Sequence, residues 1–132
     1  MTDKKQLPTD DAFQKGLAMR TQVMGQSFVD KAFGGMTEFT EPMQHHITRA
    51  AWGDTWQRGV LDLKTRSLVT VAMLTALGRS HELKGHVRGA LNNGASQEEI
   101  QEVLLHAAIY CGVPTAVEGF RAAAEVVDAP KA

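Results

Sequence analysis

Apolar residues recur at helical spacing along most of the chain, and Gly and Pro separate these stretches into helical lengths. In residues 10–23, Phe13 and Leu17 lie one turn apart, Met24 continues the pattern and Gly25 follows. We therefore expect a first helix there, capped at its start by Thr9 or Asp10.

The next part of the chain is less regular. A short helix is expected over 27–32, and a third segment spans 36–51. Pro42 lies inside that segment and predicts either a helix start near Glu41 or a kink. Residues 52–60 contain two glycines and no clear period, which predicts a loop.

Residues 64–77 are apolar on nearly every side after their first turn. This pattern predicts a buried helix rather than an amphipathic surface helix. Several β-branched residues make a strand an alternative, but the length of the segment favours a helix. Gly78 follows and would end it.

Two cap signals divide the rest of the chain. Ser80 is a candidate N-cap for a helix over 81–92, and Ser96 with Glu99 forms a capping-box pattern. The helix that Ser96 opens would end at residues 111–112, and a last helix is expected over 115–127.

These elements predict an all-α fold, a compact bundle of about six to seven helices in one domain over residues 1–132. Helices this apolar leave more apolar surface than the interior of a 132-residue chain covers. We therefore expect identical subunits to associate into a homo-oligomer.

Composition narrows the functional classes. Hydrophobic residues make up 43% and charged residues 22%, which is ordinary for a globular protein, and the formal net charge is -1. We therefore expect no nucleic-acid partner and no membrane partner. The N-terminal residues lack the apolar core of a secretory signal, and the apolar run 68–77 is shorter than the roughly 20 residues that span a bilayer. A cytoplasmic location is expected.

Candidate catalytic chemistry centres on His86 and Glu82, which are four residues apart and share one face of the expected helix. A carboxylate beside an imidazole favours the imidazolium form, which can donate a proton. A solvated surface pair is the alternative. His45-His46 are adjacent, so they point about 100° apart and are expected at the surface rather than as metal ligands.

Arginine is the candidate anion-binding group. Arg66 begins the apolar helix next to Ser67, and burying its charge requires an anionic partner, either a protein carboxylate or a substrate carboxylate. Arg49 is a further candidate.

Aromatic residues and the lone Cys111 complete the candidates. Trp52 and Trp56 are also four apart, and they are either packing anchors or the wall of a pocket. Tyr110 is either a buried residue with a local partner or a hydroxyl donor. Cys111 has no base beside it in the sequence, so a nucleophilic role is weakly supported.

Several segments resemble the carboxymuconolactone decarboxylase family. They are 51–58 (AWGDTWQR), 64–70 (KTRSLVT), 76–79 (ALGR), 82–88 (ELKGHVR), 92–94 (NNG) and 110–114 (YCGVP). The resemblance covers about residues 10–127. Alkylhydroperoxidase-like relatives carry a Cys-x-x-Cys pair before the histidine that matches His86. Here Arg79 and Glu82 occupy the cysteine positions and Ser67 the position of an earlier glutamate, which favours the decarboxylase branch.

The resemblance implies an all-α homo-oligomer, often a hexamer, that converts 4-carboxymuconolactone to the 3-oxoadipate enol-lactone in aromatic acid breakdown by the β-ketoadipate route. The unsaturated lactone accepts the electron pair left by carbon dioxide, so no cofactor or metal is expected. Alternatives are a thiol-dependent peroxidase-like enzyme using Cys111 and a non-enzymatic ligand-binding assembly of the same fold.

The expected site follows from this chemistry. His86 would donate a proton or stabilise the enolate with Glu82 tuning it, and Ser67 would add a donor. Arg66 and Arg49 would hold a carboxylate through forked hydrogen bonds. Trp52, Trp56 and Tyr110 would shape the pocket.

Overall fold

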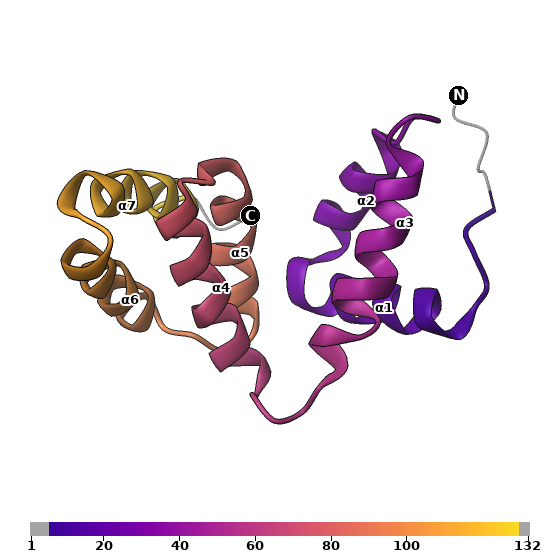
Figure 1. Ribbon diagram of the computed structural model, residues 1–132, viewed down its shortest axis with the longest axis horizontal. Coiled ribbons are helices and arrows are strands. Elements are labelled where there is room, and N and C mark those ends of the chain that lie inside the picture. Colours follow the sequence, from indigo (N-terminus) through magenta and orange to yellow (C-terminus); the bar gives the residue numbers. More distant parts are fainter. Residues whose placement is uncertain (1–5, 130–132) are drawn as a thin grey trace. The chain divides into compact units, whose positions relative to one another are not determined.

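A computed structural model of the chain describes residues 6–129 (Figure 1). Over this range the chain forms helices and no strand, so the predicted all-α fold class is confirmed. The helices divide into two compact units, one ending at Val60 and the other beginning at Leu61. The expectation of a single domain stays a prediction.

The first unit contains three α-helices and two short irregular helices. They are α1 (Asp11–Met24), α2 (Gln26–Gly34), α3 (Glu41–Ile47), a π-helical turn (Thr48–Trp52) and a 3-10 helix (Thr55–Gln57). Asp10 caps α1 by accepting from the Phe13 amide at 3.2 Å, as the sequence predicts. Pro42 lies in the first turn of α3, where its missing N–H is harmless, so the predicted start near Glu41 is confirmed. The prediction of a loop over 52–60 is wrong in part, because Thr55–Gln57 form the 3-10 helix.

Backbone contact without intervening side chains fixes α1 against the π-helical turn. A Cβ on Gly16 would lie 1.9 Å from the Thr48 carbonyl oxygen, and one on Gly53 would lie 2.3 Å from the Ala12 carbonyl oxygen. Both distances are shorter than any real Cβ contact. Only glycine at these two positions allows the two backbones to approach so closely.

A buried arginine lies beside this contact. Arg20 is 5% exposed, and its Nη1 donates to Gln44 Oε1 at 3.0 Å and to Thr48 Oγ1 at 3.3 Å. The guanidinium also lies over the Phe28 and Phe33 rings, 5.9 and 5.6 Å from their centroids. Burial lowers its pKa from the usual arginine value.

The second unit contains α4 (Leu63–Leu77), α5 (Ser80–Asn92), α6 (Gln97–Tyr110) and α7 (Val113–Val127). α4 contacts each of the other three helices. The core of the unit is made of small and medium apolar side chains from all four helices and the turn before α6: Val71, Leu83, Val87, Ala90, Ala95, Ile100, Leu104, Ala122 and Ala123. The predicted capping box at Ser96 and Glu99 is confirmed, with both reciprocal hydrogen bonds present.

Two predicted helix starts in this unit are wrong. Ser80 is the first residue of α5 rather than its cap, because Gly78 adopts a left-handed conformation and the Arg79 amide bonds back to Leu74 at 2.9 Å. The turn between α4 and α5 is therefore complete at Arg79. The last helix begins at Val113 rather than residue 115, since Pro114 fits its first turn.

The prediction that α4 is buried on nearly every side is also wrong for a single chain. Its buried residues, Ser67, Val71 and Thr75, lie on one face. On the opposite face Met73 is 60% exposed and Leu77 is 70% exposed. The other three helices of the unit cover α4 from one side, and the apolar residues of its other side remain in contact with solvent.

The close approach of α1 predicts a large penalty for Gly16→Ala. The new methyl group cannot fit without moving the backbone near Thr48, so the free energy of unfolding should fall by about 3 kcal/mol. Gly34→Ala is the matched control, because a Cβ there meets nothing within 4 Å. Urea unfolding followed by tryptophan fluorescence measures both variants, since Trp52 and Trp56 lie in this unit. Equal stability of the two variants would contradict the packing argument.

Candidate active site

His86 and Glu82 lie on α5 beside its buried face, which Leu83 and Val87 form. The His86 side chain is half-buried and Glu82 is exposed. Glu82 also belongs to the first turn of α5, where a carboxylate favours the helix dipole. The geometry therefore gives His86 a partly sheltered position and leaves Glu82 one helical turn away in solvent.

Arg66 and Ser67 lie in the first turns of α4, which Asp62 caps by accepting from the Thr65 amide at 2.7 Å. This hydrogen bond lowers the pKa of the Asp62 carboxyl, so the cap stays charged. Arg66 is half-buried. The cap therefore fixes the turn that presents the Arg66 side chain.

Asn93 is a residue of this region that the sequence reasoning missed. Ser67 is fully buried, and its Oγ accepts a hydrogen bond from Asn93 Nδ2 at 2.9 Å. The same amide group donates to the Leu63 carbonyl at 3.4 Å. Asn93 caps the end of α5, and the sequence marks it through the segment 92–94 (NNG) without assigning it a role. The amide thus ties the end of α5 to the beginning of α4.

Arg49 belongs to the π-helical turn of the first unit, and a protein carboxylate holds it there. Its Nε and Nη2 donate to the two oxygens of Asp10 at 3.1 and 2.7 Å, a forked pair. The guanidinium also lies 5.5 Å from the centroid of the Phe13 ring. The hydrogen bond to Arg49 lowers the pKa of the Asp10 carboxyl to about 2, and the same bond raises the pKa of Arg49.

Trp52 and Trp56 are both buried, and the structure brings them together. Their rings stack with centroids 4.6 Å apart and planes 24° apart. Gln57 Nε2 donates to the Trp52 carbonyl at 3.0 Å and holds the chain between them. The pair therefore acts as a packing anchor of the first unit.

Tyr110 is not in the same pocket as the residues of α5. It is 77% exposed at the end of α6, and its ring lies 4.8 Å from the ring of His106. Both residues line a groove of about 530 Å³ between α4 and α6, and neither His86 nor Arg66 lines this groove. His106 is exposed.

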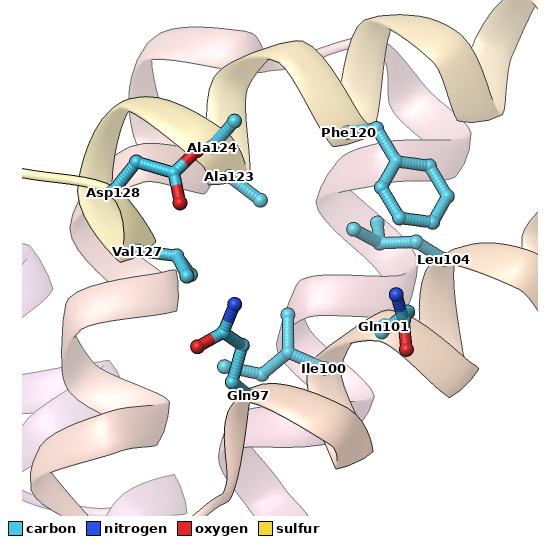
Figure 2. A pocket seen from close by; sticks show the side chains of 9 residues that line it. All are labelled: Gln97, Ile100, Gln101, Leu104, Phe120, Ala123, Ala124, Val127 and Asp128. Atoms are coloured by element: carbon cyan, nitrogen blue, oxygen red, sulfur yellow. The ribbon is translucent and has the colours of Figure 1, made fainter.

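A second pocket lies between α6 and α7 (Figure 2). Its volume is about 170 Å³, and Ile100, Leu104 and Phe120 give it an apolar wall. Gln97 and Asp128 lie on opposite sides of its opening. None of the candidate catalytic residues lines it. Within residues 6–129, no group of three or more His, Cys, Asp or Glu side chains is placed to hold a metal ion. No helix in that range is long and apolar enough to cross a membrane.

The described residues define an all-helical protein of two compact units, whose second unit carries a half-buried histidine and a half-buried arginine. The chain belongs to the carboxymuconolactone decarboxylase family, whose sequence model matches residues 41–125. The matched range spans the division between the two units. The predicted family is confirmed.

Two relatives carry decarboxylase names. The chain is 39% identical to 4-carboxymuconolactone decarboxylase of Acinetobacter baylyi over 117 residues, which cover 89% of this chain and 87% of the relative. It is 45% identical to nitrosuccinic acid decarboxylase of Metarhizium robertsii over 106 residues, covering 80% and 74%. Both names specify removal of a carboxyl group, and they specify different substrates.

The Asp10–Arg49 pair predicts a specific acid dependence of stability. The pKa of Asp10 is lowered from 3.8 to about 2 in the folded protein. The ionised carboxylate therefore contributes fully to the free energy of unfolding above about pH 4, and this contribution is lost as the pH falls through 2. Asp10→Asn keeps an N-cap and removes the charge. At pH 7 the melting temperature of Asp10→Asn should lie below that of the wild type. The difference between the two melting temperatures should shrink between pH 4 and 2.

Asp11→Asn is the control, because Asp11 forms an exposed ion pair with Lys15 one turn along the same helix. Thermal melts across this pH range measure all three proteins. A constant difference between Asp10→Asn and the wild type down to pH 2 would refute the assignment.

Proposed function

We propose that this protein decarboxylates 4-carboxymuconolactone to the 3-oxoadipate enol-lactone, as a step in aromatic acid breakdown by the β-ketoadipate route. The observation that carries the proposal is the 39% identity to a 4-carboxymuconolactone decarboxylase across 87% of that relative. The reaction needs a proton donor and a cation for a carboxylate, and we assign these roles to His86 and Arg66, both half-buried in the second unit.

The reaction balances without an added oxidant or reductant. The bond between the ring carbon and the carboxylate breaks, carbon dioxide leaves, and the electron pair delocalises into the unsaturated lactone as a dienolate. A proton then adds to the dienolate and gives the enol-lactone. The enzyme must bind the anion, stabilise the charge that develops on the lactone oxygen, and deliver the proton.

His86 is the proposed proton donor. Its half-buried position limits exchange of its proton with water, and Glu82, one helical turn away on α5, is proposed to tune it. Arg66 is proposed to bind a substrate carboxylate through two parallel hydrogen bonds. Because Ser67 is fully buried and bonded to Asn93, we assign it a positioning role for the turn that carries Arg66.

We also keep as proposals the substrate-binding roles that the resemblance implies for Arg49, Trp52, Trp56 and Tyr110. Binding of a carboxylate by Arg49 at the edge formed by Nε and Nη2 would compete with Asp10, which already accepts from both nitrogens. Trp52 and Trp56 would contribute apolar surface through their stacked rings. Tyr110 is exposed, so its hydroxyl is free to meet a ligand from solvent.

Nitrosuccinic acid is the second candidate substrate, and the 45% identity to a nitrosuccinic acid decarboxylase supports it. Loss of the carboxylate from the carbon that bears the nitro group leaves a nitronate, so this compound also accommodates its own electron pair. Both reactions need a bound carboxylate and a proton returned to carbon. Carbon dioxide release from each compound, measured with the same purified protein, distinguishes the two.

Two further properties belong to the proposal. We propose a homo-oligomer, a hexamer by family resemblance. We also propose a cytoplasmic location, since the lone Cys111 fits a reducing compartment.

Replacing the proton donor tests the proposed chemistry. His86→Ala should lower kcat for 4-carboxymuconolactone roughly 10²–10⁴-fold, the usual loss for a general acid. His81→Ala on the same helix is the control, because His81 is exposed and has no proposed role. Near-normal turnover by His86→Ala, with circular dichroism showing an intact fold, would remove His86 from the role.

Arg66→Ala tests anion binding separately. If Arg66 holds the substrate carboxylate, its loss should raise KM by about tenfold or more, and Arg66→Lys should restore part of the affinity without the forked geometry. Arg79→Ala, an exposed arginine between α4 and α5, serves as control. Steady-state kinetics of the three variants give the result, and an unchanged KM in Arg66→Ala would exclude this role.

A further inference from the structure

Arg20 on α1 is a buried cation that no described carboxylate neutralises. The side chain is 5% exposed, and its hydrogen bonds go to two neutral groups, the Gln44 amide oxygen and the Thr48 hydroxyl. No acidic side chain within residues 6–129 forms an ion pair with it. A charge buried without an anion costs free energy, because it loses its hydration and gains no opposite charge in return. The first unit therefore holds a positive charge that lacks its anion.

One edge of this guanidinium has no hydrogen-bond acceptor. Nη1 makes both of the bonds above, whereas Nε is buried and has no partner. The N–H of Nε and one N–H of Nη2 point in the same direction, so together they match the two oxygens of a carboxylate. Arg49 uses this same edge for Asp10, at 3.1 and 2.7 Å. In Arg20 no described residue occupies the corresponding edge.

The free edge is reached from solvent at Nη2. This nitrogen has no hydrogen bond to a described residue and is not fully buried as Nε is, so it contributes to the exposed fraction of Arg20. Phe28, whose ring centroid lies 5.9 Å from the guanidinium carbon, is itself 38% exposed. The Phe28 and Phe33 rings attract the cation but offer no acceptor oxygen to the edge. An anion that meets Nη2 from solvent would therefore find two donors without competition.

We propose that the Nε–Nη2 edge of Arg20 binds the carboxylate of a small organic anion. Two charge-assisted hydrogen bonds would give Nε its missing acceptor, and the anion would neutralise the buried charge. A single-atom anion such as chloride does not present two oxygens side by side, so the edge favours a carboxylate. The site is distinct from the carboxylate-binding role proposed for Arg66, which lies in the other unit.

The test measures how a carboxylate changes the stability of the full chain. Formate is the probe because it is the smallest carboxylate, and chloride at the same ionic strength measures screening alone. If the dissociation constant is about 10 mM, about 100 mM formate should raise the ratio of folded to unfolded protein roughly tenfold. Chloride should change that ratio by less than about twofold. Urea unfolding followed by the fluorescence of Trp52 and Trp56 reports the unit that contains Arg20.

Two variants locate the effect. Arg20→Met removes the charge and keeps a long unbranched side chain, and such replacements of a buried charge by an apolar group are often neutral or stabilising. This variant should fold and should lose the response to formate. Arg58→Met is the matched control, because it removes an exposed arginine of the same unit and should keep the roughly tenfold response.

If Arg20→Met fails to fold by circular dichroism, nuclear magnetic resonance of the wild type replaces it. Formate should then shift the backbone amide signals of Gln44 and Thr48, which bond to Arg20, and leave those around the exposed Arg121 in place.

Four results would each overturn the proposal. They are an equal response of the wild type to formate and chloride, a full formate response in Arg20→Met, formate-induced shifts spread over the exposed arginines, and a stability that ignores formate but rises with protein concentration. In the last case the carboxylate would come from another chain. None of these measurements uses decarboxylase activity, so the Arg20 site and the proposed reaction succeed or fail separately.

Discussion

The second unit depends on how α4 is held from one side. The helix contacts α5, α6 and α7, and it turns Ser67, Val71 and Thr75 toward them. The two hydroxyl residues in that row are satisfied locally, since Thr75 Oγ1 donates to the Val71 carbonyl at 2.7 Å and Ser67 accepts from Asn93. Polar groups buried without such partners would cost stability. The Ser67–Asn93 bond also joins α4 to the end of α5, and with this row of residues buried, Met73 and Leu77 are left on the outer face of α4.

The first unit depends on a different constraint, the absence of side chains at Gly16 and Gly53. With the backbones of α1 and the π-helical turn in direct contact, the turn begins beside the buried Arg20 and ends at Trp52. Arg49 lies in this turn, and its guanidinium reaches the Asp10 cap of α1. One close approach therefore accounts for the position of an arginine that the sequence alone presents only as a candidate for anion binding.

Local signals predicted the helices well and the side-chain partners poorly. The capping box at Ser96 and the start of α3 near Glu41 depend on residues within one turn, so the sequence contains all the information they need. The Arg49–Asp10 pair joins residues 39 positions apart and the Ser67–Asn93 bond residues 26 apart, and no helical period encodes either. The apolar character of 64–77 was identified correctly, but burial within one chain did not follow from it, since a pattern does not say which surface covers a helix.

The two decarboxylase relatives limit what the chain must supply. A butenolide and a nitro compound share little shape, yet each stabilises the carbanion that remains after carbon dioxide leaves. An enzyme for either substrate therefore needs a cation for the carboxylate and a protonated group near carbon, and under the proposed function Arg66 and His86 provide these. Selectivity between the two must then come from the side chains that contact the rest of the molecule. Under the proposed function, a change of substrate therefore requires different side chains around His86 and Arg66, while the packing of α4 against α5 can stay unchanged.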